Sequence, residues 1–316
     1  SSFLHVYQKP RRLFHTNAPR FNQPTKKTLF FIFFFTACFS VLSVLLICIF
    51  LFSSGIPAIH QIGLGNFLFG TVWRPANNLF GIFRLIVGSL YVTAGALIIG
   101  VPVGVLTAVF MSSFCPEAIY RPLKAAINLM AGIPSVVYCF FGLVVLVPFV
   151  RDNIGGFGMG VLTASILLGL MILPTIISVS EAAIRAVPRS YYEGGLALGA
   201  SHERSIFFAV LPAAKRGILA SVILGIGRAI GETMAVIMGA GNQAVLPDSL
   251  TSGVRTMTTN IVMEMGYSSG LHREALIGTA VVLFIFVLIS NIIFLFLHKE
   301  ESTWITSIPI ASSFLS

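Results

Sequence analysis

Long apolar runs are the feature of this sequence that most constrains its fold. A helix needs about 20 consecutive, mostly apolar residues to cross a bilayer. Six runs reach that length, at residues 29–52, 85–111, 125–150, 157–180, 217–240 and 275–297. Only the fifth run contains charged side chains, namely Arg228 and Glu232. We therefore expect an all-α integral membrane protein with six transmembrane helices.

The composition excludes a soluble globular fold. Hydrophobic residues make up 56% of the 316 residues and charged residues only 10%, whereas soluble domains carry about 25% charged residues. So few charged side chains cannot supply the polar surface of a soluble chain this long. The net charge of +9 comes from basic residues spread over the segments that flank the runs, which indicates a membrane orientation and no nucleic-acid partner.

The positions of the basic residues predict the orientation. If both termini are cytoplasmic, most lysines and arginines lie on the cytoplasmic side, as the positive-inside rule requires. The first run is too long for the apolar region of a signal peptide, about 7 to 15 residues, so we expect it to be retained. The expected order is a basic cytoplasmic tail (1–28), a first transmembrane helix (29–52), an external loop (53–84), a membrane domain (85–297) and a cytoplasmic tail (298–316).

The segment 181–216, on the expected inner side, has the pattern of two short helices. Pro188 favours the start of a helix, and Gly199 suits a left-handed helix end. Ser201 can cap a second helix, which we expect to stop before Pro212. Apolar and charged side chains alternate on these helices, so the segment can pack on the inner ends of the spans or meet a partner protein.

This segment resembles the EAA loop of bacterial ABC importer permeases, whose pattern is E-A-A-x3-G-x9-I-x-L-P. The matching residues are Glu193, Gly199, Leu211 and Pro212. Three positions depart from the pattern, since Gly194 and Gly195 replace alanines and Ala209 replaces an isoleucine. The literal Glu-Ala-Ala at 181–183 lacks the glycine and the Leu-Pro at the required distances, so it is not the motif.

Three further motifs resemble the permease subunits of bacterial phosphate importers. They are Gly225-Ile-Gly-Arg-Ala-Ile-Gly-Glu-Thr-Met-Ala-Val236, Ala131-Gly-Ile-Pro-Ser-Val-Val-Tyr138 and Ser269-Gly-Leu-His272. The resemblance extends from about residue 29 to residue 297. It implies a MetI-like, type I ABC importer permease fold, with the transmembrane type-1 domain at 85–297 and the coupling loop at 181–216.

The resemblance also implies partners in the bacterial inner membrane. These are a second permease subunit, a dimer of a cytoplasmic ATPase, an external phosphate-binding protein and membrane lipid. In such permeases the EAA loop forms coupling helices in a groove of the ATPase, which assigns that role here to Glu193, Gly199, Ser201, Arg204 and Pro212. The chain has no G-x-x-x-x-G-K-[ST] motif for binding ATP. We expect no enzyme activity, cofactor or metal on this chain.

Arg228 and Glu232 are the first candidates for the substrate pathway. Four residues apart on a helix, they lie on one face and can pair. A charge at mid-bilayer costs roughly 2.5 to 3.5 kcal/mol, so such residues face a cavity or a partner helix. A guanidinium suits an oxyanion, and the nearby carboxylate would weaken binding enough for release. Ser135 and Tyr138 are further candidates, because Pro134 breaks the helix beside them.

Other interpretations stay open. The charged pair can instead be a contact between helices, favoured by small and polar residues on the same face, which are Gly217, Ser221, Gly225, Ala235 and Gly239. Sulfate or molybdate could use the same arginine, so only the motifs favour phosphate. A passive channel would not need the inner helices. An intramembrane enzyme would need histidines or paired acids within the spans, and all 6 histidines lie outside them or at their edges.

Overall fold

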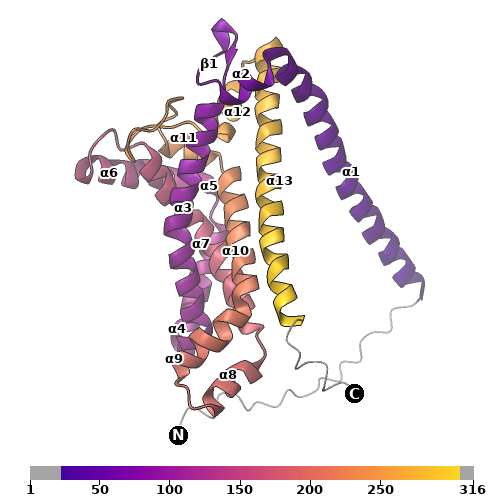
Figure 1. Cartoon of the computed structure of the whole chain (residues 1–316), viewed down its shortest axis with the longest axis vertical. Helices are drawn as coiled ribbons and strands as arrows, with labels where there is room; N and C mark the ends of the chain where they lie inside the picture. The colour runs from indigo at the N-terminus through magenta and orange to yellow at the C-terminus, as the bar shows by residue number, and fades with distance from the viewer. Residues whose placement is uncertain (1–22, 307–316) are drawn as a thin grey trace. The chain divides into compact units, whose positions relative to one another are not determined.

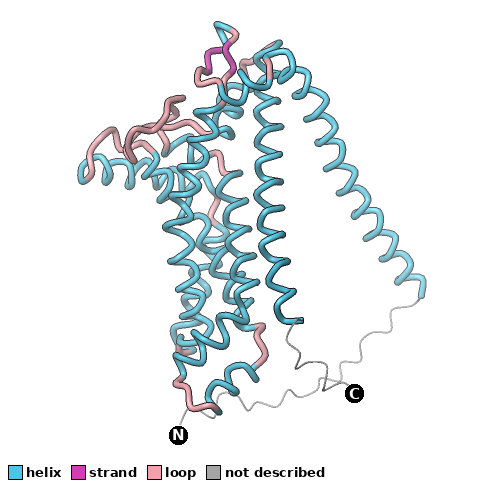
Figure 2. Tube along the Cα trace, in the orientation of Figure 1, coloured by secondary structure: helices cyan, strands magenta, loops and turns pink. Residues whose placement is uncertain are grey.

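The computed structural model describes the backbone of residues 23–306 and the side chains of residues 28–292. This part of the chain is almost entirely helical (Figures 1 and 2). Its strands form one short antiparallel hairpin, β1 (Trp73–Arg74) with β2 (Leu79–Phe80), in which Trp73 pairs with Phe80. Of the two predicted tails, residues 1–22 and 307–316 lie outside the described residues.

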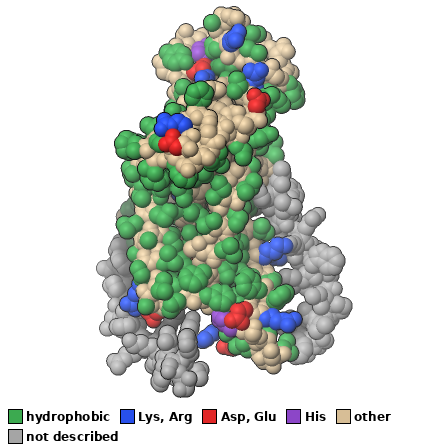
Figure 3. All heavy atoms as spheres, turned by 90° about the vertical axis from the view of Figure 1, so that its left-hand side faces the viewer, with side chains coloured by type: hydrophobic (Ala, Val, Ile, Leu, Met, Phe, Trp, Pro, Cys, Tyr) green, Lys and Arg blue, Asp and Glu red, His purple; other side chains and the backbone are tan. Residues whose placement is uncertain are grey.

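Six helices of the described chain are long and apolar enough to cross a membrane. They are Thr28–Ile62, Phe83–Phe114, Ser135–Asn153, Val161–Arg185, His202–Gly231 and Gly270–Ile292. Hydrophobic side chains cover the middle of the face in Figure 3, and most charged side chains lie toward its two ends. The predicted fold class, an all-α membrane protein with six spans, is therefore confirmed.

Helix α1 (Gln23–Ile62) contributes to two compact units, of which the first ends at Phe50 and the second begins at Leu51. In the first unit the described side chains are almost all exposed, although they are almost all apolar. A helix that is apolar on all sides suits contact with lipid. The helix continues beyond its predicted end to Ile62, with Pro57 inside it, so the predicted loop 53–84 starts with helical turns.

Glycines allow close packing at the centre of the second unit. Its central helices are α3 (Phe83–Val109), α7 (Val161–Arg185) and α10 (Leu211–Gly231). A Cβ atom added to Gly100 or Gly104 of α3 would lie 2.8 Å from Ile172 or 2.7 Å from Ile176 of α7. A Cβ on Gly225 of α10 would lie 3.2 Å from the same Ile176. The small residues therefore let three backbones approach one another around buried isoleucines.

Three π-helical segments of the described chain each end two residues before a proline. They are η2 (Phe110–Phe114) before Pro116, η3 (Gly142–Leu146) before Pro148 and η4 (Ile206–Val210) before Pro212. A proline has no N–H for the carbonyl four residues earlier, and its ring clashes with that carbonyl. At Pro148 and Pro212, where the helix continues, the wider π turn makes room for the ring, whereas the backbone becomes extended at Cys115 before Pro116. The predicted helix stop before Pro212 is therefore wrong, because the chain continues through η4 into α10.

Two of the predicted spans are interrupted. The third breaks at Ile133 and Pro134, which have extended backbones, and the fifth breaks at Glu232 and Thr233. The helices on either side are α4 (Glu117–Gly132), α5 (Ser135–Phe141), α6 (Val147–Asn153), α10 and α11 (Met234–Gly239). Proline disfavours a helical conformation in the residue before it, which explains the first break.

A buried carboxylate joins several segments at the end of the second unit that carries β1. The other helices at this end are α2 (Leu64–Phe69), α12 (Met257–Met265) and α13 (Gly270–Thr306), and η1 (Pro75–Asn77) links the two strands. Glu264 of α12 accepts hydrogen bonds from Trp73 Nε1 at 2.8 Å, Arg255 Nη1 at 2.8 Å and His272 Nε2 at 2.9 Å. His272, the last residue of the motif Ser269-Gly-Leu-His272, therefore has a structural role as a hydrogen-bond partner of Glu264.

A second buried carboxylate lies near the end of α7, and the end of the second unit that carries α8 is opposite the end that carries β1 (Figure 1). Glu181 is 2% exposed and accepts hydrogen bonds from the Tyr120 hydroxyl at 2.7 Å, Lys124 Nζ at 2.7 Å and Arg185 Nε at 3.0 Å. Arg185 also donates to the carbonyl of Met111 at 3.0 Å. The hydrogen bond to Glu181 raises the pKa of Tyr120. The literal Glu-Ala-Ala thus helps to join η2, α4 and α7, and it is not a docking motif.

We predict that Glu181→Ala strongly destabilises the protein. Removal of one partner from a buried ionic cluster leaves the other charges uncompensated and costs about 3–5 kcal/mol. Thermal and denaturant unfolding of the detergent-solubilised protein would measure the loss. The control is Glu117→Ala, because Glu117 is 63% exposed and pairs with Arg121 at 2.8 Å, so its loss should cost less than about 1 kcal/mol. Equal effects of the two substitutions would contradict the role of the cluster.

Candidate functional site

Arg228 lies in the last turn of α10, directly before the break in the fifth span. Its side chain is exposed, and its Nη1 donates a hydrogen bond to Thr175 Oγ1 of α7 at 3.3 Å. A guanidinium has five N–H groups, so this bond leaves donors for an anion. An exposed cation within a span has to face a water-filled cavity or a partner chain. Arg228 is therefore oriented by α7 and accessible from outside the subunit.

The predicted pairing of Arg228 with Glu232 is wrong, because no ion pair joins these two described residues. The helix ends at Gly231, so Glu232 no longer follows the helical periodicity that would put it beside Arg228. Instead, Glu232 Oε1 accepts the backbone N–H of Met234 at 3.1 Å. The carboxylate therefore satisfies a backbone donor at the start of α11, and the two charges have different partners on either side of the break.

Tyr138 and Ser135 lie in α5, just after the break in the third span. The Tyr138 hydroxyl donates to the carbonyl of Met130 at 2.9 Å and so connects the two sides of that break. Helix α5 packs against α11, and Tyr138 packs against a buried cluster that contains Ala229 and Ala235 from the two sides of the second break. The structure thus places Tyr138 beside the break that Arg228 and Glu232 flank, with Ser135 one helical turn away from Tyr138.

The small residues before the break make contacts between helices. Ser221 Oγ lies 2.7 Å from Ser180 Oγ of α7, and Gly217 faces Ala183 so closely that an added Cβ would overlap with it. The small residues on the Arg228 face of α10 therefore serve helix packing. On this face only Arg228, beside the break, remains a candidate for substrate contact.

The two short helices of the inner segment and the turn between them, which we call the inner hairpin (residues 189–210), have the predicted local structure. Its first helix, α8 (Arg189–Ala197), starts directly after Pro188, and Gly199 has the left-handed φ of 80°. Ser201 Oγ accepts the backbone N–H of Arg204 at 3.3 Å and so caps α9 (His202–Ser205). The predictions for Pro188, Gly199 and Ser201 are confirmed as local structure, while the hairpin's role in coupling stays a prediction.

The hairpin presents apolar and charged side chains to its surroundings. Leu198 is 91% exposed and Phe208 is 77% exposed. The Arg204 guanidinium lies 5.9 Å from the centre of the Phe208 ring, and Glu193 lies 3.9 Å from Arg189 with most of its side chain exposed. Large exposed apolar side chains beside charges are typical of a surface that binds another protein. Glu193 and Arg204 are thus accessible to a partner.

The two glycines that replace alanines in the EAA pattern differ in their surroundings. Nothing lies within 4 Å of a Cβ added to Gly194. A Cβ added to Gly195 would lie 2.7 Å from Ser205 Oγ and 3.0 Å from Ser205 Cβ. Ser205 is 2% exposed, so it has little room to move. Gly195 is therefore needed for the contact between α8 and α9, whereas Gly194 is not.

Sequence reasoning missed three residues that the structure brings to these sites. Thr175 orients Arg228, His202 connects the hairpin to the end of α3, and Glu264 joins the segments around β1. Thr175 and Glu264 meet partners that are distant in the sequence, and no local pattern marks them. His202 follows the predicted cap Ser201, which places it at the start of α9 but does not reveal its contacts.

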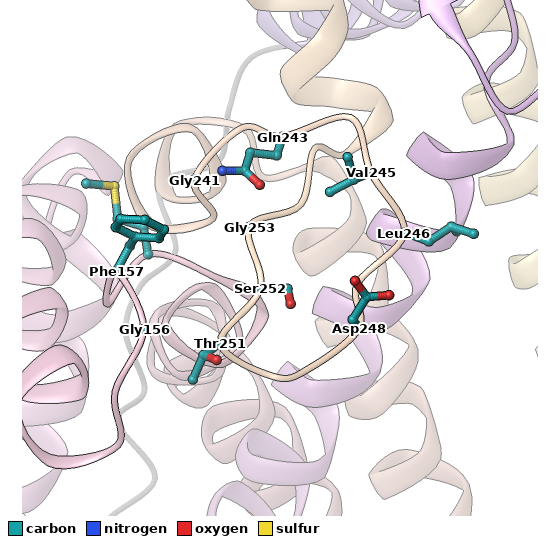
Figure 4. Close-up of a pocket in the computed structure, with 11 residues that line it drawn as sticks. Gly156, Phe157, Gly241, Gln243, Val245, Leu246, Asp248, Thr251, Ser252 and Gly253 are labelled. Carbon is teal, nitrogen blue, oxygen red and sulfur yellow. The ribbon is translucent and has the colours of Figure 1, made fainter.

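A pocket of about 490 Å³ lies between the loop after α6 and the loop after α11. Figure 4 shows the second loop curving around the pocket, with Gly156 and Phe157 on the other side. Gln243, Asp248, Thr251 and Ser252 supply its polar side chains. Backbone hydrogen bonds fix the second loop to the start of α7, among them Leu162 N to Leu250 O at 2.8 Å. The pocket is therefore preformed in this subunit.

We predict opposite effects for alanine at the two adjacent glycines. Gly195→Ala should destabilise the hairpin, because the new methyl group meets the buried Ser205. Gly194→Ala is the matched control and should be neutral or stabilise by up to about 1 kcal/mol through helix propensity. Protease cleavage within 189–210 of the purified protein would measure local stability. The double variant Gly195→Ala/Ser205→Gly should recover part of the loss, and equal behaviour of both single variants would contradict the contact.

Comparisons with known proteins agree with this architecture. The family described as "Binding-protein-dependent transport system inner membrane component" matches residues 100–300. The phosphate transport system permease protein PstC of Haemophilus influenzae is 34% identical over 273 residues, which cover 79% of this chain and 86% of the relative. The probable ABC transporter permease protein YqgH of Bacillus subtilis is 40% identical over 207 residues, covering 65% of this chain and 67% of the relative.

Solved structures support the same fold at low sequence identity. A MetNI methionine ABC transporter chain in an inward-facing conformation aligns with a TM-score of 0.53 at 20% identity, covering 72% of this chain and 99% of that one. A chain of a bacterial ABC transporter that imports alginate aligns with a TM-score of 0.54 at 16% identity, covering 83% and 95%. The chain belongs to the family of binding-protein-dependent transport system inner membrane components.

Proposed function

We propose that this chain is a membrane-spanning permease subunit of an ATP-driven phosphate importer. One observation carries the proposal: the motif 225–236, which resembles phosphate permeases, forms the interrupted span that exposes Arg228. The relatives named as phosphate permeases favour phosphate as the substrate. In this proposal the subunit forms part of the translocation path and transmits the work of a separate ATPase, so it is not itself an enzyme.

Arg228, Glu232, Ser135 and Tyr138 form the proposed transit site. The guanidinium binds phosphate oxygens by charge-assisted hydrogen bonds, and the Thr175 hydroxyl keeps it in position. A lone desolvated arginine would hold phosphate too tightly for transport. The carboxylate of Glu232, on the other side of the break, repels the anion and weakens binding. Because Glu232 is held by the backbone of α11 and not by Arg228, movement of α11 can change the balance of attraction and repulsion.

The inner hairpin is the proposed contact with the ATPase. Glu193, Arg204 and the exposed Leu198 and Phe208 form a mixed surface of the kind that fits a groove in a partner. Gly199, the Ser201 cap and Pro212 hold the geometry of this surface. We propose that both termini are cytoplasmic and that an ATPase dimer binds on this side. A second permease subunit would then cover the exposed side of Arg228 and complete the path.

An external phosphate-binding protein is the proposed partner at the opposite end. The loops 53–84 and 241–274 lie there, and the second of them contains the pocket of Figure 4. Its fixed backbone and polar groups are suited to a docking segment. In the proposed mechanism, closure of the ATPases moves the hairpins as levers, the spans open outward, and phosphate passes from the binding protein to the transit site.

The first test concerns the transit site. We predict that Arg228→Gln and Glu232→Gln in the assembled transporter, reconstituted in vesicles, each reduce phosphate uptake severalfold while ATP hydrolysis continues. The control is Arg151→Gln, because Arg151 is a largely exposed arginine paired with Asp152 at 3.0 Å. Normal uptake by both charge variants would contradict the pathway role and leave helix contact as their function. Uptake of labelled phosphate in the presence of unlabelled sulfate or molybdate would separate phosphate from the alternative oxyanions.

The second test concerns the ATPase contact. We predict that Glu193→Lys and Gly199→Pro each reduce co-purification of the ATPase. The first reverses a charge on the proposed surface, and the second forces φ to about −65° where the chain needs 80°. Glu117→Lys, another exposed acidic side chain near this end, is the control and should retain the ATPase. Phosphate flux through the chain without any ATPase would contradict the importer and favour a passive channel.

A further inference from the structure

His202 lies in α9 of the inner hairpin and faces η2, which continues α3. Its Nδ1 is 2.8 Å from the Tyr192 hydroxyl of α8, and its Nε2 is 3.3 Å from the carbonyl oxygen of Ser113 in η2. The ring also makes edge-to-face contacts with Phe114 and Tyr192, at centroid distances of 5.1 and 5.6 Å. One imidazole thus contacts α8 and η2 from its position in α9.

The hydrogen bonds determine the form of this imidazole. The Ser113 carbonyl only accepts, so Nε2 must carry the proton and donate. In the neutral ring Nδ1 is then an acceptor, and the Tyr192 hydroxyl donates to it. Both hydrogen bonds therefore have the same donor-to-acceptor direction. The Tyr192 hydroxyl of α8 donates to His202, and His202 donates to the Ser113 carbonyl of η2. The hydrogen bonds of His202 thus connect α8 to η2.

From η2 the same helix leads to the transit site. α3 and η2 are one continuous helix, and Gly104 of α3 packs on Ile176 of α7. Ile176 also contacts Gly225 of α10, one turn before Arg228, and its neighbour Thr175 bonds to Arg228. Arg185 of α7 also donates to the Met111 carbonyl of η2, so a displacement of η2 moves α3 and α7 together, and both contain residues near the helix carrying Arg228. Close-packed interiors have low compressibility and transmit strain, so helices in such contact move together.

We propose that His202, with Tyr192, is a positioning residue that carries the movement of the coupling hairpin into α3. The inference rests on the proposed function of the hairpin as the ATPase contact. The apolar contacts of η4 connect the hairpin to α10, with which η4 is continuous. The His202 link adds a hydrogen-bonded attachment to η2, beside the contact of Phe207 of η4 with Phe114 of η2 at a ring-centroid distance of 6.4 Å, so that the hairpin moves α3 and α10 together. Without that link, movement of α8 reaches η2 through apolar packing, and less of it is transmitted to α3.

The test uses the assembled transporter in phospholipid vesicles and measures phosphate taken up per ATP hydrolysed. Tyr192→Phe removes only the hydroxyl, and His202→Phe keeps a ring against Phe114 but removes both hydrogen bonds. Each is expected to lower phosphate per ATP severalfold while the ATPase still co-purifies. The double variant should be no worse than His202→Phe, because both substitutions break the same link. Ser113→Ala is the control, because the bond uses the main-chain carbonyl, and it should leave the ratio unchanged.

The outcomes separate this inference from the proposed function. If uptake and ATP hydrolysis fall in proportion, His202 serves only the stability of the hairpin and the inference is wrong. An unchanged ratio in Tyr192→Phe overturns it as well, because that variant keeps the ring and its packing. If Glu193→Lys and Gly199→Pro leave the ATPase attached and transport normal, the hairpin is not the contact and the proposed function fails first. A lower ratio in Tyr192→Phe with a silent Ser113→Ala supports the link.

Discussion

The need to satisfy every backbone hydrogen bond without water governs this structure. Within a bilayer an unpaired N–H or C=O costs several kcal/mol, so a spanning segment is helical unless something replaces the lost bonds. Both breaks have such replacements. Tyr138 donates to the carbonyl of Met130 at the first break, and the Glu232 carboxylate accepts the N–H of Met234 at the second. The two breaks can therefore exist near one another, and irregular backbone marks where a polar path is possible.

The two buried carboxylates act as anchors on either side of this region. Glu264 fixes the segments around β1, and Glu181 fixes η2, α4 and α7 at the other end. Each accepts three hydrogen bonds, which satisfy the carboxylate oxygens without exposure to solvent. Between the anchors the helices meet in close contact through glycines and isoleucines. The architecture thus combines polar anchors at both ends with a closely packed middle.

Sequence patterns predicted the parts of the fold that depend on local chemistry. The apolar runs predicted six spans, and Pro134, Gly199 and Ser201 predicted a break, a left-handed turn and a cap that the structure contains. Local chemistry failed at Pro212, where a π turn relieves the clash that usually ends a helix. It also failed for Arg228 and Glu232, because the four-residue spacing implies pairing only if the helix continues between them. A break after Gly231 removed that condition.

The sequence by itself determined that this chain crosses a membrane six times, carries an EAA-like hairpin and has one charged span. These follow from hydropathy, from proline and glycine geometry and from residue spacing, which are all properties of neighbours in the chain. Only the tertiary structure decided that Thr175 holds Arg228, that His202 joins the hairpin to η2 and that Gly195 rather than Gly194 is required. Those contacts join residues whose distance in space is set by how helices pack, and packing depends on the whole bundle.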